Sequence, residues 1–456
     1  MIIAPTRARF AFAGRRLDAA YFCSPGVRAA EVLALLRKAA VPMPTIASDN
    51  SLGSVFHPNR FKRQLAASAE EALPFLRAFD VFEYLPQPAD WISVKRTDKL
   101  DSLRVNEGVI LLTRSGRNLG PAVMVDAYLA KFIPSDDLLR VRIDDERMRN
   151  YAFAFLNSTT GQNLLRQDKT GSVIDHLSGD QVAQQCVPVL ENIVDDVADD
   201  VRKTLQLRET ARLTLAKAVT DLESTVYQPR GKPARDGWAI PASALCGRLD
   251  AAFYDEGIAQ LRSDMLKTGG VRLGDVATVR KPAGRYKTYY VDAEHGRPLL
   301  SGRNLLQMTP IGLKHIAERS IPSDSGYEVR AGWTCFQADG RAEERLGYPV
   351  IVTSERSGWL ASGHVARVAP MDGIEVGWIW TAIASKLVQR QMAGLACGSV
   401  VDALYEDDLR NLVLPLLPPA EGPCVATAWE MFAESNALEA VATGRIESEI
   451  SKVLAM

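Results

Sequence analysis

Arginine and amide side chains in two polar loops are the residues of this sequence whose types best suit chemistry with a ligand. Each loop follows a short apolar run, one at 109–113 and one at 333–337. A guanidinium can make paired hydrogen bonds to the edge of guanine, and an Asn or Gln carboxamide can do the same with adenine. Because loops on a rigid scaffold commonly carry such contacts, we expect these side chains to contact DNA. They are Arg114, Ser115, Arg117 and Asn118 in the first loop, and Gln337, Arg341 and Arg345 in the second.

Other basic, hydroxyl and aromatic side chains are candidates for contacts to phosphate groups. Cations, hydroxyls and backbone amides place a protein on the nucleic-acid backbone without reading its sequence. These candidates are Arg60, Lys62, Arg63, Lys95, Arg96, Lys169, Thr170, Ser172, Arg285, Lys287, Tyr289 and Ser399. The alternative interpretation is a helix cap beside Gly171 and Gly398, and a solvated face elsewhere. For the two loops, the alternative is a solvated hairpin whose arginines pair with acids such as Asp339.

The motifs of known catalytic centres are absent from the sequence. The five histidines form no HExxH or HxH pattern, and neither a Gly-x-Ser-x-Gly elbow nor a GxxxxGK[ST] loop occurs. The one Pro-Pro pair, Pro418-Pro419, lacks the preceding Asp or Asn expected of a DNA amino-methyltransferase. The six cysteines form no CxxC pair, which favours reduced core thiols over zinc ligands. We therefore predict a non-catalytic chain that binds no metal or cofactor; a self-contained nuclease or methyltransferase is the alternative.

An internal repeat supplies the elements that must position the candidate residues. The segment RLDAA at 16–20 returns at 248–252, and shorter tags follow in the same order with offsets between 221 and 227. The paired tags are Leu52-Gly53 with Leu273-Gly274, Pro74-Phe75-Leu76 with Pro298-Leu299-Leu300, Val105 and Gly108 with Val329 and Gly332, Gly116-Arg117 with Gly340-Arg341, Gly171-Ser172-Val173 with Gly398-Ser399-Val400, and Val187-Pro188-Val189 with Leu414-Pro415-Leu416. A constant order with small drifts in offset predicts two homologous modules that differ by loop insertions.

Each copy predicts a mixture of helices and strands. The runs 109–113 and 333–337 are rich in strand-forming residues after a turn glycine. Apolar residues at helical spacing predict helices over 151–168 and 378–396. The repeated Asp18 and Asp250 are interpreted as helix caps or as ion-pair partners of Arg16 and Arg248. The tryptophans Trp378, Trp380 and Trp429 are expected to be core or interface anchors.

Two long helices are predicted, one after each copy. Apolar residues recur every three or four positions from Ile193 to Val226 and from Val425 to Val453, and we expect these helices to pair antiparallel. The fold class is therefore α+β, with two mixed modules separated by two long helices. The expected domains are a first module at 1–190 with an N-terminal extension at 1–50, a spacer helix at 191–227, a linker at 228–240, a second module at 241–420 and a spacer helix at 421–456.

Composition and charge limit the partners of the chain. Hydrophobic residues make up 47% and charged residues 24% of its 456 residues, as in ordinary soluble proteins. The net charge is −1, but the helical stretches 191–227 and 421–456 carry −3 and −4, which leaves +6 on the rest. Neither a signal peptide nor an apolar run of about 20 residues occurs. We expect a cytoplasmic chain that does not enter a membrane.

The order of these features, twice over, resembles the specificity subunit of type I restriction-modification systems. The resemblance covers essentially the whole chain and depends most on Arg272-Leu273-Gly274-Asp275-Val276 and on the two GSV(I/V)DxL segments, at 171–177 and 398–404. The first copy departs from the pattern, because Ser51-Leu52-Gly53-Ser54-Val55 is a degraded start. The resemblance implies two target recognition domains that each bind half of a bipartite site on double-stranded DNA. It also implies two helices that dock methyltransferase subunits and set the spacing of the half-sites.

Partners and alternatives follow from the same resemblance. It implies two DNA methyltransferase subunits, which would use S-adenosylmethionine, and a restriction or translocase subunit in some such systems. A type I enzyme, a methyltransferase-nuclease with a separate recognition subunit and another phage-defence complex all remain open as the system it serves. A non-catalytic protein-interaction scaffold that has lost DNA readout is the alternative function, and the near-neutral charge motivates it.

Overall fold

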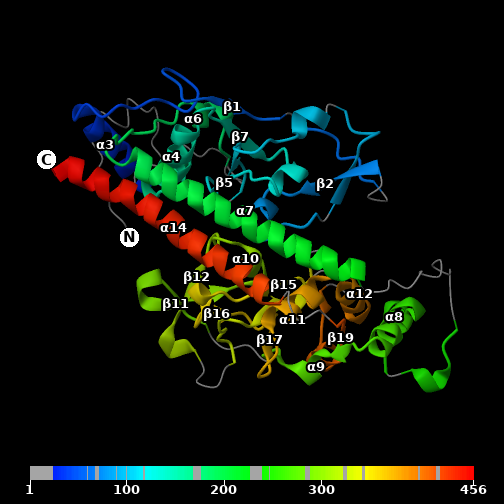
Figure 1. Cartoon of the computed structure of the whole chain (residues 1–456). Coiled ribbons are helices and arrows are strands. Elements are labelled where there is room, and N and C mark those ends of the chain that lie inside the picture. The colour runs from blue at the N-terminus through cyan, green and yellow to red at the C-terminus, as the bar shows by residue number, and fades with distance from the viewer. Residues whose placement is uncertain are drawn as a thin grey trace. The chain divides into compact units, whose positions relative to one another are not determined.

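The fold mixes α-helices and β-strands, in agreement with the sequence-based fold class (Figure 1). The computed structural model describes residues 24–455 apart from 59, 67–70, 89, 99, 117–118, 168–175, 226–238, 246, 283–287, 322–325, 341–344, 399–400 and 417–421. The chain divides into two compact units: unit 1 is Met1–Glu209 with Glu434–Met456, and unit 2 is Thr210–Ala433. Each unit therefore contains part of both long helices.

The main sheet of unit 1 has four antiparallel strands in the order β1 (Ser54–Phe56), β7 (Leu138–Arg142), β4 (Ile110–Thr113) and β5 (Ala122–Met124). All four residues of β4 are buried, because both faces of this central strand are covered. The core combines the sheet with helix α4 (Glu146–Asn157), whose residues from Asn150 to Leu156 are all buried. This apolar core holds the loop that follows Thr113 at the end of a rigid strand.

The main sheet of unit 2 repeats this strand order. Its strands are β9 (Ala277–Arg280), β17 (Val365–Pro370), β13 (Thr334–Gln337) and β15 (Pro349–Ile351), and all neighbours are antiparallel. The register agrees as well: Thr113 lies opposite Leu138, and Gln337 lies opposite Val365. The two loops predicted to contact DNA therefore leave equivalent strands.

A smaller sheet is also present in each unit with the same pairing. In unit 1, β2 (Ala72–Leu76) pairs antiparallel with β3 (Asp90–Ser93) and parallel with β6 (Ile133–Pro134). In unit 2, β11 pairs antiparallel with β12 and parallel with β16. These strands are β11 (Gly296–Leu300), β12 (Lys314–Ala317) and β16 (Leu360–Ala361). Strand β10 (Tyr290–Val291) pairs with β12 and adds an edge to the sheet. Pro74 faces Trp91 as Pro298 faces His315, so this predicted pair of tags occupies equivalent positions.

The remaining elements connect and cover the sheets. In unit 1 the helices are α3 (Pro25–Lys38), α5 (Thr159–Gln167) and α6 (Gly179–Ala183). In unit 2 they are α8 (Glu256–Lys267), α9 (Leu273–Val276), α10 (Gly302–Leu306), α11 (Val376–Ala384), α12 (Lys386–Leu395) and α13 (Glu406–Arg410), with the short strands β8 (Val271–Arg272), β14 (Asp339–Gly340), β18 (Asp402–Ala403) and β19 (Val413–Leu414). Among the described residues, no helix is both long and apolar enough to cross a bilayer.

One side-chain hydrogen bond recurs in both units at an offset of 227. Tyr151 donates its hydroxyl to Pro188 O (2.7 Å), and Trp378 donates its indole N–H to Pro415 O (3.0 Å). These bonds fix the repeated apolar-Pro-apolar tags against α4 and α11. The first bond satisfies a hydroxyl that packing has removed from water, and the second lies in a part-buried position.

Two glutamines form a second recurring contact, a glutamine clamp that joins a loop carbonyl to a helix carbonyl in each unit. Gln162 Nε2 donates to Gly120 O and Leu156 O, at 2.8 and 2.7 Å. Gln389 Nε2 donates to the equivalent carbonyls of Gly347 and Ile383, at 3.0 and 2.8 Å. Gly120 and Gly347 have φ values of 95° and 80°, which only glycine adopts readily, so the loop can turn back onto the helix.

The long helical segments predicted inside the modules are each broken. The segment 151–168 is covered by α4 and α5, which meet at Ser158, and 378–396 by α11 and α12, which meet at Ser385. Both serines have extended backbone angles, with ψ of 161° and 149°. A single helix over either segment is therefore wrong. Apolar spacing alone does not reveal the break, because the chain resumes a helix immediately after one extended residue.

One pair of sequence tags is also corrected. Leu273 N donates to Leu412 O (2.8 Å), and the residue that makes the equivalent bond in unit 1 is Ile46, to Gln185 O (3.0 Å). Ile46 and Leu273 are both fully buried. The counterpart of Leu273 is therefore Ile46 and not Leu52, so Ser51–Val55 is not the degraded start of the first copy. The apparent Leu-Gly match arose within a connection whose length differs between the copies.

The two long helices are α7 (Val194–Thr225) and α14 (Gly422–Ala455). Within unit 1 they run antiparallel: Asn192, just before α7, donates to Glu449, and Arg208 donates to Ser435 Oγ (3.2 Å). Val197, Val201, Ile446 and Ile450 contribute to the unit 1 core, as the apolar periodicity predicts. In unit 2, Trp429 of α14 packs edge-on against the buried Trp380 of α11, with ring centroids 5.6 Å apart. Trp380 and Trp429 are thus core anchors, as expected.

Glutamates of the long helices cap helices of the modules. In unit 1, the Glu447 carboxylate of α14 accepts from Thr160 N (2.7 Å) and Thr160 Oγ1 (2.8 Å) at the start of α5. In unit 2, the Glu223 carboxylate of α7 accepts from Lys386 N (2.7 Å) at the start of α12. The first amides of a helix have no partner within it, and an acceptor with negative charge is favourable there.

Replacing Glu447 with alanine is expected to lower the free energy of unfolding by about 1–2 kcal/mol, because the amide and hydroxyl of the buried Thr160 lose their acceptor. The measurement is urea denaturation followed by circular dichroism. Glu434→Ala is the matched control, since Glu434 lies on the same helix and is exposed. Equal destabilisation by the two variants would contradict a capping role.

Candidate nucleic-acid interface

The basic loop at 60–63 presents exposed cations beside the small sheet of unit 1. Arg60, Lys62 and Arg63 are all exposed. Arg63 is also held in place: its guanidinium lies 3.3 Å from the carboxylate of Asp136 and 5.0 Å from the centre of the Phe75 ring. The Asp136 side chain is only 9% exposed, so Arg63 balances a largely buried charge. The ion pair with Asp136 therefore explains the position of Arg63 without any contact to phosphate.

The pair Lys95 and Arg96 follows strand β3, and both side chains are exposed. Lys95 Nζ lies 2.5 Å from Glu71 Oε1, with 71% and 62% of the two side chains exposed. An ion pair this exposed contributes little to stability. Lys95 can therefore leave Glu71 for a phosphate at small cost.

The first candidate loop is tied to its surroundings through Arg114 and Ser115. Ser115 Oγ lies 3.0 Å from His176 Nδ1 and 3.4 Å from Asp137 Oδ1. Burial lowers the pKa of His57, and the positive charge of Arg114 lowers it further. Arg114 is half-buried, and its backbone is fixed at the root of the loop: Arg114 N donates to Asp137 O (3.3 Å), and Leu177 N donates to Arg114 O (2.8 Å).

The second candidate loop begins with an engaged glutamine. Gln337 Nε2 donates to Asp339 O (2.7 Å), and its side chain fills the space where Gly302 and Gly340 lack a Cβ atom. Asp339, the acid that the alternative interpretation paired with loop arginines, lies 2.6 Å from Lys281 Nζ and 2.8 Å from His364 Nδ1. This polar cluster fixes the root of the second loop. The sequence singled out Gln337 and Asp339, but not their neighbours Lys281 and His364 as site residues.

The other described candidates of unit 2 lie apart from this cluster along the chain. Tyr289 precedes β10 and is 43% exposed, with the Arg319 guanidinium 5.9 Å from its ring centre. Arg345 has a φ of 63°, in the left-handed region, within the turn before Gly347. The candidates that lie outside the described residues are Arg117, Asn118, Lys169, Thr170, Ser172, Arg285, Lys287, Arg341 and Ser399.

The expected ion pair of the repeated RLD segment is confirmed in the second copy. Arg248 and Asp250 are joined at 2.6 Å. Hydrogen bonding to Asp250 raises the pKa of Arg248, and hydrogen bonding to Arg248 lowers that of Asp250. These residues are structural, as predicted. Arg16 and Asp18 of the first copy fall outside the described part of the chain.

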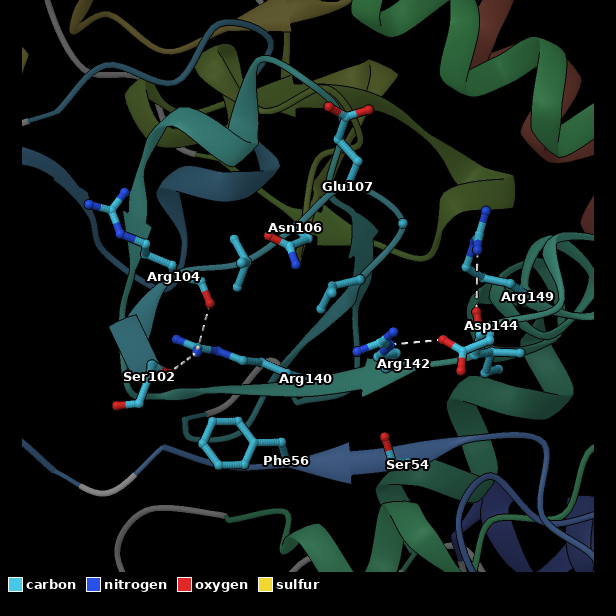
Figure 2. Close-up of a pocket in the computed structure, with 14 residues that line it drawn as sticks. Ser54, Phe56, Ser102, Arg104, Asn106, Glu107, Arg140, Arg142, Asp144 and Arg149 are labelled. Carbon is cyan, nitrogen blue, oxygen red and sulfur yellow. Dashed lines mark hydrogen bonds and ion pairs between the residues drawn. The ribbon is translucent and has the colours of Figure 1, made fainter. Parts of the chain in front are cut away.

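A basic pocket of about 520 Å³ opens at the edge of the unit 1 main sheet (Figure 2). Four arginines, two acids and one exposed aromatic ring contribute to its lining. These residues are Arg104, Arg140, Arg142, Arg149, Glu107, Asp144 and Phe56. They come from four separate chain segments, which is why sequence patterns did not identify the pocket. The described residues contain no group of three or more side chains suited to hold a metal ion.

One of the four arginines has a structural role that recurs in unit 2. Arg140 donates to Ser102 O (2.8 Å) and Leu103 O (2.9 Å), and burial lowers its pKa to about 10. The equivalent Arg367 donates to Tyr327 O (3.0 Å) and Ala361 O (2.6 Å). An arginine repeated at an offset of 227 is a sequence signal that could have found this pair.

No protein-family model matches the chain, and no curated protein matches its sequence. Among solved structures, it is similar to a type I restriction-modification S subunit from M. genitalium, with 11% identity over 90% of this chain and 98% of the other and a TM-score of 0.27. It is also similar to the HsdS subunit from Thermoanaerobacter tengcongensis, with 15% identity over 84% and 90% and a TM-score of 0.28.

A third similar structure comes from work on the assembly and conformational transition of the type I R-M system. The identity is 16% over 84% of this chain and 91% of the other, with a TM-score of 0.28. Because all three TM-scores lie below 0.5, the function proposed below depends on the residues and topology of this chain.

Replacing Arg63 with alanine is expected to lower the free energy of unfolding by about 1 kcal/mol, because Asp136 loses its ion-pair partner while it stays buried. Lys62→Ala is expected to change it by less than about 0.5 kcal/mol, since Lys62 is exposed. Urea denaturation of the two variants in parallel makes the measurement. If Arg63→Ala leaves the free energy of unfolding unchanged, the ion pair with Asp136 has no structural role.

Proposed function

We propose that this chain is the DNA sequence-specificity subunit of a restriction-modification or related phage-defence complex. The observation that carries the proposal is the equivalent placement of the two candidate loops. One leaves β4 after Thr113 and the other leaves β13 after Gln337, and the two strands hold the same place in sheets of the same order. Two equivalent loops on two modules suit a bipartite site with one half-site for each module.

The repeated topology supports an internal duplication as the origin of the two modules. The strand order, the Tyr151 and Trp378 bonds and the two glutamine clamps all recur. The loops themselves differ in sequence, so each module would read a different half-site. Arginines and amides in the loops would contact base edges, and the surrounding cations would contact phosphates.

The proposal includes protein partners. A non-catalytic recognition chain needs subunits that act on the DNA it selects, and two DNA methyltransferase subunits that use S-adenosylmethionine fit a chain with two modules. A restriction or translocase subunit would join in systems that cleave DNA. The long helices α7 and α14, of 32 and 34 residues, offer the surfaces for docking. Their net negative charge favours a basic partner surface.

The experiment that tests the function is methylome sequencing of cells with and without the gene. The expected result is a bipartite methylation motif that disappears when the gene is removed. A methylome that does not change would leave the protein-interaction scaffold as the better interpretation. Methyl transfer or cleavage by the purified chain alone, with S-adenosylmethionine and magnesium, would instead favour the self-contained enzyme.

The two loops provide a matched pair of variants. Arg117→Ala is expected to relax one half-site only, and Arg341→Ala the other, because each arginine belongs to the loop of one module. A lost bidentate contact to a base costs about 1–3 kcal/mol of discrimination at that position. Selection from a random duplex library, with the partner methyltransferase present, measures the enriched motif. Uniform weakening across all sequences would show that these arginines contact phosphates instead.

A further inference from the structure

We propose that the basic pocket of unit 1 binds a nucleotide, with the phosphate on Arg142 and Arg149 and the base or sugar against Phe56. The proposal concerns a second binding site, separate along the chain from the loop at 114–118 to which base reading was assigned. It does not depend on the pocket taking part in sequence recognition. A free nucleotide and a nucleotide within a DNA strand share the chemistry that the pocket would recognise.

The charge of the pocket favours an anion. Four arginines against Glu107 and Asp144 leave its lining with a formal charge of +2. Arg142 and Asp144 form an ion pair at 2.8 Å, but 71% and 82% of their side chains are exposed. Such a pair is weak in water. A phosphate can therefore replace Asp144 as the partner of Arg142 with bidentate geometry, and a free monophosphate also brings up to twice the charge of the carboxylate.

Arg149 is an incompletely satisfied donor on the same side of the pocket (Figure 2). Its Nη1 donates to Ile143 O at 3.3 Å, while its buried Nε has no acceptor among the residues that the structure describes. Gly108 faces this guanidinium: a Cβ atom at that position would lie 3.1 Å from Arg149 Cζ. The absence of a side chain at Gly108 therefore leaves room for the guanidinium.

Arg142 and Arg149 do not belong to the framework that the two units share. Arg142 pairs with Ser54 in the sheet, and the equivalent residue of unit 2, paired with Thr278, is Ala369. By the offset of 227 that relates Tyr151 to Trp378, the counterpart of Arg149 is Val376. Of the four arginines, Arg140 keeps an arginine counterpart, and its Nη1 and Nη2 donate to backbone carbonyls. The two arginines proposed to hold phosphate are thus additions to the shared framework.

The size and the aromatic rim favour a nucleotide over a bare phosphate. A pocket of about 520 Å³ lies in the range of small-molecule sites. Phe56 is 48% exposed, and one side of its ring is near the Arg140 guanidinium, 5.8 Å from the ring centre. An exposed ring beside cations is suited to stack on a base. The counterpart of Phe56 in unit 2 is Arg280, so the aromatic rim belongs to unit 1 alone.

The test is calorimetric titration of the full chain at low salt with deoxyadenosine monophosphate, deoxyadenosine and inorganic phosphate. We expect saturable binding of the monophosphate and at least about tenfold weaker binding of the nucleoside, which lacks the charge-assisted contacts. The double variant Arg142→Gln with Arg149→Gln should bind the monophosphate at least about tenfold more weakly. Phe56→Ala should bind the monophosphate about fivefold or more weakly and should leave the affinity for inorganic phosphate unchanged.

The matched control is Arg28→Gln, which makes the same charge change at an exposed position on α3 of unit 1. A second arm measures the affinity of a duplex oligonucleotide for the same variants. Loss of duplex affinity in the arginine variants without binding of the free monophosphate identifies a nucleotide within a strand as the occupant. The proposal is overturned if neither affinity changes by more than it does in Arg28→Gln. That result would not contradict sequence reading by the two loops. Conversely, failure to find a bipartite methylation motif would not contradict binding of the free monophosphate in the pocket.

Discussion

Each module of this chain is completed by a carboxylate from the long helix that follows the other module in sequence. Glu447 of α14 caps α5 in unit 1, and Glu223 of α7 caps α12 in unit 2. Asn157 extends the unit 1 contact, because it donates to Glu439 of α14 and exchanges hydrogen bonds with Ala122 of β5. The last helix is therefore linked by hydrogen bonds through Asn157 to strand β5, at the edge of the main sheet of the first module. Cutting the chain between the modules would remove one of these helices from each unit.

Much of the fold could be predicted from the sequence, because burial and turn geometry constrain short tags strongly. Pro74 and Pro298 occupy the same register, and Gly108 and Gly332 share φ values of 81° and 80°. The recurring contacts were harder to predict, since Tyr151 and Trp378 supply the same hydrogen bond from different side chains. A search for identical residues does not find a pair whose only shared property is an aromatic ring with a donor.

The errors have physical causes of the same kind. Leu52 matched Leu273 by type, but the backbone bond to the end of the module belongs to Ile46, which is equally apolar and equally buried. Long helices over 151–168 and 378–396 fitted the apolar spacing, yet one extended serine in each changes the direction of the chain without changing that spacing. The candidate site shows the same limit, because its arginines come from β7, from α4 and from the segment after Leu103, which meet only in the folded unit.

The roles of the arginines show why basic residues alone could not locate an interface. Arg140 and Arg367 are almost fully buried, and their Nη atoms donate to backbone carbonyls, so these side chains serve the fold. Arg63 is half-exposed but neutralises Asp136. Arg142, in contrast, has only an exposed partner and no arginine counterpart in unit 2. Arginines that are exposed, weakly paired and not required by the repeated framework are the ones free to bind an anion. By that criterion the two modules are not equivalent. The pocket of unit 1 has Phe56 at its edge, and the equivalent residue of unit 2 is Arg280.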